Sequence, residues 1–311
     1  MNIEQYQQLG AKKETTELTP IALTAPDYAI AWHEIGGVKA VNSMNERRLR
    51  RASFAPVQPV GGAYIGEASG TFEPVPSGTD GTAPLWYAFL EASGADIATD
   101  VATWGAQDTA YAPQGSTLTI IHRDGQWART AAGARVESLT FKAKRGELWL
   151  CEMTAIGRYS EVSASSFLAT ALPTINGKPF LGHAVSVGGS AVTVSEIEIK
   201  IENVISPVED GTHESGNGKN IITEQRLTAT ITVLYDGTDY FSKLRNIEAA
   251  DLLDVSAQMS TGAAGNVLTW SGTMALMEDV EKTYIEGNGY LVLSGEFVAT
   301  TLNAVLTLTQ S

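Results

Sequence analysis

Hydrophobic and polar residues alternate in short runs along most of the chain, and glycine, asparagine and aspartate separate these runs. In the clearest run, residues 191–202, isoleucines fall on one side and charged residues on the other: Ile197, Ile199 and Ile201 against Glu196, Glu198, Lys200 and Glu202. A period of two is typical of a β-strand with one buried face. The pattern therefore predicts a half-buried strand here.

The same alternation recurs in residues 117–121, 226–235 and 289–300. Residues 137–154 contain two alternating stretches around Arg145 and Gly146, which predicts a hairpin with a tight turn at these two residues. Because runs of this kind dominate the chain, we expect a mainly all-β fold.

Helical patterns are few and short. Residues 82–94 begin with Thr82 as a candidate cap and end at Gly94, and Leu85, Phe89 and Ala92 recur at helical spacing. We expect this helix to dock on a sheet. A second short amphipathic helix is predicted for residues 239–245, with a weaker continuation to residue 253.

The two halves of the chain show the same succession of patterns. Residues 67–74 match 226–233, residues 116–120 match 266–270, and residues 148–155 match 291–298. Identity between these segments is low, so a duplication and an unrelated succession of strands both stay open. We divide the chain into an N-terminal arm (1–26), a first domain (27–162), a linker (163–178) and a second domain (179–311), and expect two related β-sandwich or barrel-like units with short helices docked on their sheets.

The charge of the chain argues against one class of function. With 35 acidic and 21 basic side chains, the formal charge is −14, and such a surface on average repels nucleic-acid phosphates. The N-terminus lacks the apolar core of a secretory signal, and no run of about eighteen apolar residues occurs, so we expect a soluble intracellular protein without membrane contact.

The residues that usually carry chemistry are scattered. The four histidines, His33, His122, His183 and His213, form no metal-binding spacing, and the single cysteine, Cys151, is expected to be buried. Residues 210–219 resemble a phosphate loop without its required order, and residues 236–239 resemble a calcium loop without its later ligands. We expect no catalytic, cofactor or metal site, and no enzymatic activity.

Two charged segments are candidates for contacts between subunits. One is the basic cluster Arg47, Arg48, Arg50 and Arg51, for which acidic patches of a neighbouring subunit are a better partner than nucleic acid. The other is a predicted long hairpin loop that contains Glu209, Asp210, Glu214 and Lys219.

Several of these segments together resemble the major tail tube proteins of long-tailed, siphovirus-type bacteriophages. The segments are residues 65–74, 84–92, 133–141, 194–204 and 225–233, and the resemblance covers residue 27 to the end. It implies a β-sandwich-like virion protein, assembled in the host cytoplasm, whose rings stack into a hollow tail tube through which DNA passes without specific binding. Its implied partners are further copies of itself and the tape measure, tail terminator and distal tail proteins.

If the chain is duplicated, three copies supply six units and close a pseudo-sixfold ring, which is the arrangement we expect; the alternative is a ring of six copies. A negatively charged inner wall lets DNA slide. The arm and residues 207–220 are candidates to bridge successive rings.

Other functions remain open on the same strand pattern. These are another virion component, such as a tail terminator or decoration protein, or a carbohydrate-binding or adhesin-like sandwich. The carbohydrate alternative needs exposed aromatic residues, for which Trp104, Trp127 and Trp270 are the candidates.

Overall fold

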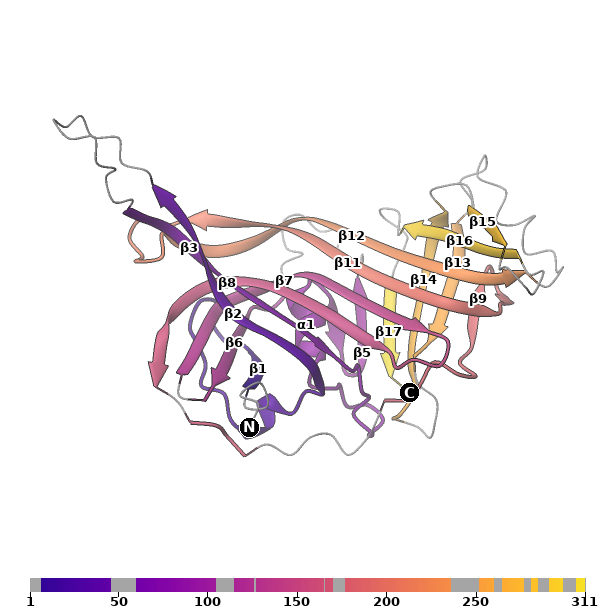
Figure 1. Cartoon of the computed structure of the whole chain (residues 1–311), viewed down its shortest axis with the longest axis horizontal. Helices are drawn as coiled ribbons and strands as arrows, with labels where there is room; N and C mark the ends of the chain where they lie inside the picture. The colour runs from indigo at the N-terminus through magenta and orange to yellow at the C-terminus, as the bar shows by residue number, and fades with distance from the viewer. Residues whose placement is uncertain are drawn as a thin grey trace.

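The computed structural model describes residues 7–45, 60–104, 115–125, 127–164, 166–169, 177–235, 252–259, 265–276, 281–284, 291–298 and 306–310. Within these residues the fold is mainly antiparallel β-structure, as expected, with a 3-10 helix, η2 (Ala25–Tyr28), and a six-residue helix, α1 (Tyr87–Ala92) (Figure 1). None of the described helices has the length and apolar character needed to cross a membrane.

The first half of the chain forms a curled antiparallel sheet of six strands. Its edges, β1 and β2, approach each other, since Trp32 Nε1 in β2 donates a hydrogen bond to the carbonyl of Leu9 in β1 at 2.7 Å. The strand order is β1 (Gln7–Lys13), β6 (Leu118–Asp124), β7 (Trp127–Lys144), β8 (Leu150–Ala164), β3 (Val60–Phe72) and β2 (Trp32–Asn45).

The second half repeats this order. Strand β14 and the short β15 both pair with β16, so together they occupy the place that β7 has in the first half. The order is β9 (Val185–Val187), β13 (Leu252–Gln258), β14 (Leu268–Leu276) with β15 (Glu281–Tyr284), β16 (Leu291–Val298), β12 (Asn217–Tyr235) and β11 (Val194–Glu209).

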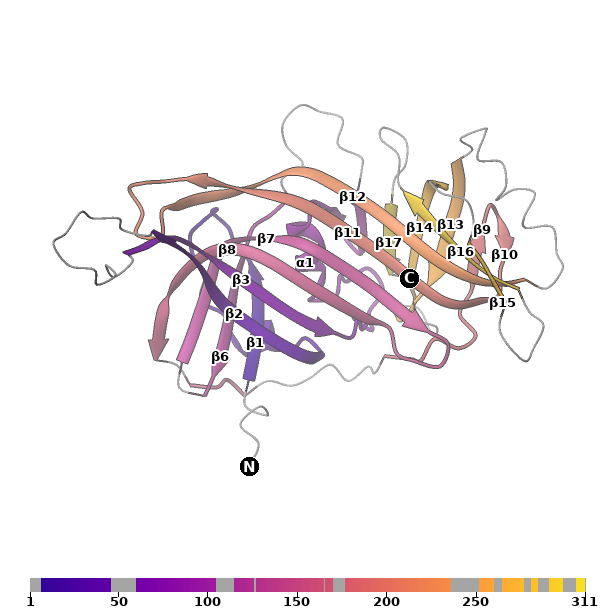
Figure 2. The ribbon, with the colours of Figure 1, turned by 45° about the horizontal axis from the view of Figure 1, so that its top comes forward.

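Among the described residues, pairing between strands joins the two halves at two places. Residues 138–144 of β7 pair with residues 196–202 of β11. The C-terminal β17 (Leu306–Gln310) lies between β14 and β5 (Val101–Trp104), and β5 also pairs with β4 (Asp96–Ala98). The remaining strand, β10 (Ser190–Ala191), pairs with β9. One sheet therefore runs through both halves in the order β2–β3–β8–β7–β11–β12–β16–β15 (Figure 2).

Part of the predicted N-terminal arm, and the residue that follows the predicted linker, are paired with other segments. Residues 7–13 of the predicted arm form β1 on the edge of β6, and Leu9 and Leu23 are buried. The predicted linker ends at the bridge between Leu148 and Pro179. The division into two domains stays a prediction, because the halves share a sheet.

The hydrophobic core is shared between the halves as well. Trp104 of β5 stacks on Trp270 of β14 with ring centroids 5.3 Å apart, and Phe141 of β7 packs against Trp270 at 5.1 Å. All three side chains are almost fully buried. The core thus continues across the seam between β7 and β11 rather than ending there.

The alternation in sequence predicts strand faces correctly. Ile197, Ile199 and Ile201 are buried along β11. The hairpin between β7 and β8 turns at Gly146, whose φ of +86° is the left-handed conformation that glycine adopts without strain. Cys151 is buried in β8, and burial raises the pKa of its thiol.

The helix in residues 82–94 is shorter than predicted. Residues 84–89 form turns in which Tyr87, Ala88 and Phe89 donate to the carbonyls three residues before them, and α1 begins only at Tyr87. This tighter winding takes Leu85 off the side of the helix that carries Phe89. Leu85 is therefore 50% exposed, whereas Phe89 is buried. The helix predicted for residues 239–245 lies outside the described residues.

Replacing Trp270 with alanine should destabilise the fold strongly, because it removes the ring that joins Trp104 to Phe141. Loss of a buried aromatic side chain costs about 3–5 kcal/mol. Trp127, which is 53% exposed, is the matched control, and Trp127→Ala should change stability little. Denaturant unfolding of both variants measures this difference, and equal losses would contradict a shared core centred on Trp270.

Candidate functional site

Where the structure describes the side chains of the eight-stranded sheet, in β2, β3, β8, β7, β11 and β12, one face is largely polar and the opposite face forms the core. Residues directly opposite each other on neighbouring strands share a face, and one such row crosses β8, β7, β11 and β12 as Glu152, Thr140, Lys200 and Thr228. The next row along the strands contains Lys142, Glu198 and Thr230. Period-two alternation in long adjacent strands therefore builds a broad polar surface.

Ion pairs cover the middle of this face, where β7 and β11 meet. Lysine Nζ and glutamate Oε1 atoms lie 2.6 Å apart in Lys142–Glu152, 3.2 Å in Lys144–Glu196 and 2.7 Å in Lys200–Glu202. The exposed fraction of these six side chains lies between 35% and 57%. Each exposed pair contributes little to stability, but it places a negative charge next to the positive charge of the lysine.

A groove lies beside these ion pairs, at the point where β7 leaves β6 and joins β11. Its volume is about 450 Å³, and it is lined by Glu137, Ser138, Glu202, Asn203, Val204, Glu224 and Arg226. Burial, and secondarily the nearby Glu67, raise the pKa of Glu137. With three carboxylates and one basic group in its lining, the groove is acidic.

The described side chains of the polar face carry a modest acidic excess. Its described residues include eight carboxylates and five basic groups, namely Glu34, Glu67, Glu137, Glu152, Glu196, Glu198, Glu202 and Glu224, and Lys39, Lys142, Lys144, Lys200 and Arg226. Most of the formal charge of −14 therefore belongs to other parts of the chain.

The hairpin of β11 and β12 extends beyond this sheet. After Glu202 it leaves β7 and runs across the first half of the molecule toward the ends of β2 and β3 (Figure 1). There the carbonyl of Ser215 accepts a hydrogen bond from Tyr64 N at 3.0 Å, and Asn217 Nδ2 donates to the carbonyl of Tyr64 at 2.8 Å. A Cβ on Gly216 would lie 2.9 Å from Ala63 Cβ, so glycine permits this close approach.

The turn of this hairpin is shorter and better ordered than the predicted long loop. The strands reach Glu209 and resume at Asn217, and Asp210 Oδ1 accepts hydrogen bonds from the backbone N and the hydroxyl of Thr212, at 2.9 and 2.6 Å. These bonds hold the pKa of the Asp210 carboxyl below its usual value. The candidate contact residues Glu209, Glu214 and Lys219 are exposed, whereas the basic cluster at residues 47–51 lies outside the described residues.

A buried polar junction holds the hairpin to the sheet. The pairing of β7 with β6 ends at Ala134 and that with β11 begins at Ser138, so Val136 faces no strand on this edge. Asn203 Nδ2 donates to the carbonyl of Val136 at 2.8 Å. It also donates to the carbonyl of Ser93, the residue that follows α1 in sequence, at 3.0 Å. A side chain of β11 thereby replaces the missing strand partner.

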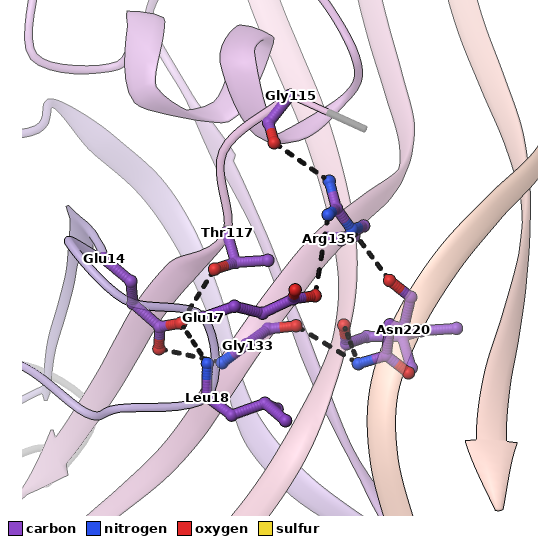
Figure 3. Close-up of polar contacts among 9 residues, drawn as sticks. Glu14, Glu17, Leu18, Gly115, Thr117, Gly133, Arg135 and Asn220 are labelled. Carbon is purple, nitrogen blue, oxygen red and sulfur yellow. Dashed lines mark hydrogen bonds and ion pairs between the residues drawn. The ribbon is translucent and has the colours of Figure 1, made fainter. Parts of the chain in front are cut away.

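Arg135 and Asn220 complete this junction (Figure 3). Arg135, only 3% exposed, donates from Nε to the carbonyl of Asn220 at 2.8 Å, and its Nη2 lies 3.7 Å from Glu17 Oε1. Burial lowers the pKa of Arg135, and Glu17 opposes this shift. Asn220 Nδ2 in turn donates to the carbonyls of Gly133 and Ile156, at 3.2 and 3.4 Å.

Glu14 is the second buried anchor in this region (Figure 3). Its carboxylate accepts four hydrogen bonds of 2.8 to 2.9 Å, from the backbone N atoms of Leu18 and Gly133 and the hydroxyls of Thr117 and Thr119. Gly133, at a bulge of β7, thus has its N–H bound by Glu14 and its carbonyl bound by Asn220. These residues could not be identified from the sequence, because an isolated Glu, Arg or Asn gives no periodic signal.

The histidines lie on separate elements. His122 is buried below Gly37 in β2, and His183 packs against Phe180; burial lowers the pKa of both histidines. His213 lies in the β11–β12 turn, bonded to Ser215. Among the described residues, no three or more His, Cys, Asp and Glu side chains gather as a metal site would require.

Two of the three tryptophans considered for carbohydrate binding are core residues. Trp104 and Trp270 are 0% and 1% exposed and stack on each other, so neither can offer a ring to a sugar. That part of the carbohydrate hypothesis is wrong, because both rings lie on the buried face of the strands that flank β17 on either side. Trp127 is exposed, at the start of β7.

The chain matches a known protein family. The family described as phage tail tube protein matches residues 6–299, nearly the whole chain. No curated protein matches the sequence.

Replacing Glu14 with glutamine should destabilise the fold. Glutamine keeps one acceptor oxygen and brings an NH₂ group against donors that need acceptors, and a buried unsatisfied group costs about 1–3 kcal/mol. Glu147→Gln is the control, since Glu147 lies at an exposed position in the turn between β7 and β8. Denaturant unfolding should show the larger loss for Glu14→Gln; an equal or larger loss for Glu147→Gln would contradict the anchor role.

Proposed function

This chain belongs to the phage tail tube protein family, and we propose that it is the non-enzymatic subunit that assembles into stacked rings and forms the hollow tail tube. The family makes it a component of the virion tail. We further propose assembly in the host cytoplasm and passage of DNA through the tube during ejection.

The observation that carries this proposal is the continuous sheet through both halves, with a polar face on one side and the shared core on the other. A tube wall needs a broad surface that water and DNA can contact, backed by a rigid layer. A sheet that continues through a whole chain provides both.

The repeated strand order supports three copies per ring in preference to six. Each chain then contributes two wall units of the same order, one from β2, β3, β8 and β7 and one from β11, β12, β16 and β15. Three chains supply six units around a pseudo-sixfold axis. A ring of six chains is the alternative.

We assign the polar face to the channel. Its acidic groove repels phosphate, and its central lysines lie beside carboxylates, so few cations are available to hold DNA. DNA then slides along the wall without being bound at a specific site.

The charged residues identified in the sequence are proposed as contacts between copies. Glu209, Asp210, Glu214 and Lys219 lie at and beside the turn of the β11–β12 hairpin, where they can reach another subunit or ring. The arginines at residues 47, 48, 50 and 51 are proposed for the same role from their charge alone. By family membership, the tape measure, tail terminator and distal tail proteins are further proposed partners.

Electron microscopy of the purified protein tests the role directly. We expect rings and hollow polymers, with three chains per ring in averaged end views. Six chains per ring would keep the tube role and remove the argument from the repeated strand order. Assembly that stops at a single ring would favour a tail terminator, and chains that stay monomeric at high concentration would contradict the tube role.

Removing the carboxylates that pair with lysines should make the wall bind DNA. We expect tubes of the variant Glu152→Gln, Glu196→Gln, Glu202→Gln to retain duplex DNA in low salt, because Lys142, Lys144 and Lys200 lose their partners. Each new phosphate contact should steepen the dependence of log K on log salt by about 0.9. Cosedimentation of tubes with DNA over a salt series measures this.

The control variant removes the same number of carboxylates from exposed positions off this face, as Asp80→Asn, Asp96→Asn, Glu147→Gln. It should not retain DNA. Equal retention by both variants would show that overall charge matters, and not the polar face.

A further inference from the structure

Strand β17 occupies a site that both halves of the molecule build. It lies between β5 of the first half and β14 of the second (Figure 1), and it pairs with residues 101–104 and residues 268–272. Together with residues 77–82, these two segments form what we call the β17 site. Among the described residues, only β17 connects β5 to β14, so this junction between the halves exists only while β17 is in place.

The core side of the β17 site is apolar. Leu308 lies opposite Ala102 of β5 and Trp270 of β14, and all three side chains are buried. The hydroxyl of Tyr87 donates to the carbonyl of Leu308 at 3.5 Å. Backbone pairing on both edges and a pocket for an alternate side chain are the features by which a sheet binds an extended peptide.

Gln310 fits a polar pocket at the end of the site. Its side chain is 1% exposed, and its Oε1 accepts a hydrogen bond from Ser77 N at 2.8 Å. Its Nε2 donates to Ser77 Oγ and to the carbonyls of Thr79 and Thr82, at 2.7, 2.9 and 3.0 Å. Glutamate would place a carboxylate oxygen against two carbonyls, and alanine would leave Ser77 N without its acceptor. The pocket is therefore specific for glutamine.

The strands that flank the site precede β17 in sequence, so both are synthesised before it. Until β17 is seated, β5 and residues 268–272 of β14 each present an open edge to the site. Open strand edges pair readily with other chains, which leads to aggregation. Seating of β17 removes both edges at once.

We propose that the β17 site is a peptide-binding site for an extended segment that carries leucine and, two residues later, glutamine, and that seating of β17 there makes the chain competent to assemble. Strand β17 is then the ligand of this site as well as a part of the fold. The second part of the inference rests on the proposed tube function, and the first part does not.

Hydrogen exchange of the unmodified protein gives the first test. If β17 leaves its site while the rest stays folded, amides in residues 101–104, 268–272 and 306–310 exchange through one partial opening. We expect them to exchange at least about tenfold faster than amides in residues 197–201, which lie between β7 and β12. Equal exchange in all four segments would overturn the site as an independent unit.

Gln310→Ala and Gln310→Glu test the recognition of glutamine. Both variants should raise exchange at least about tenfold in residues 77–82, 101–104 and 268–272, and leave residues 197–201 unchanged. Thr309→Ala is the matched control, because Thr309 is the neighbouring residue in the strand and faces the other side, and it should leave exchange unchanged. A rise of the same size in residues 197–201 would show that Gln310 serves overall stability, against the proposal.

A synthetic peptide with the sequence of residues 305–311 and an N-terminal fluorophore tests binding between separate chains. It is added to the full chain carrying Gln310→Glu, in which the resident strand is weakened. We expect saturable binding by fluorescence anisotropy and restored slow exchange in residues 101–104 and 268–272. The same peptide with Gln310→Ala should bind at least about tenfold more weakly. The unmodified chain, whose site is filled, is the control and should bind neither peptide.

Electron microscopy of these samples tests the connection to assembly. The Gln310→Glu chain should form few rings or tubes, the Thr309→Ala chain should assemble as the unmodified chain does, and the peptide with glutamine should restore assembly of the Gln310→Glu chain.

The outcomes separate the two parts of the proposal. No binding of the glutamine peptide, or equal binding of both peptides, overturns the site. Normal assembly of the Gln310→Glu chain overturns the connection to assembly and leaves the site intact. Unmodified chains that never assemble contradict the proposed function and this connection, while exchange and peptide binding still decide whether the site exists.

Discussion

The change of partner along β7 is the constraint on which the rest of the structure depends. Residues 127–134 of β7 pair with β6, residues 138–144 pair with β11, and β8 follows the other edge for most of its length. One strand therefore belongs to both halves and fixes their relative orientation. The continuous polar face, the shared core and the repeated strand order across the seam all require this exchange.

An exchange of partners leaves backbone groups that must be satisfied, and side chains from distant segments do this here. Asn203 binds the carbonyl of Val136, while Glu14 and Asn220 bind the two backbone polar groups of Gly133. A buried polar group without a partner costs more than a typical hydrogen bond contributes. These bonds make the junction specific, since no other register of β11 or β12 would offer the same donors. They also connect the start of the chain, the middle of the first half and the hairpin of the second.

The local structure could be predicted well where it follows periodicity. The isoleucines of β11, the turn at Gly146 and the burial of Cys151 were evident from alternation and turn residues, because these are properties of a strand and its immediate neighbours. The prediction for Leu85 was wrong, since it assumed an α-helical turn where the chain winds more tightly before Tyr87. For the candidate site, the residues at the hairpin turn were identified, but the ion-paired face was recognised only as the outer side of single strands.

The mainly β character, the inward-facing side chains of β11 and the resemblance of several segments to a tail tube protein could be predicted from the sequence. These depend on spacing along the chain, which the sequence contains in full. Which strands are neighbours became known only from the three-dimensional structure. The pairing of β7 with β11, the stacking of Trp104 on Trp270 and the meeting of Glu14, Arg135 and Asn220 at one bulge join residues that lie far apart in sequence. Such contacts depend on the register and order of strands, and many orders bury the same alternating pattern equally well.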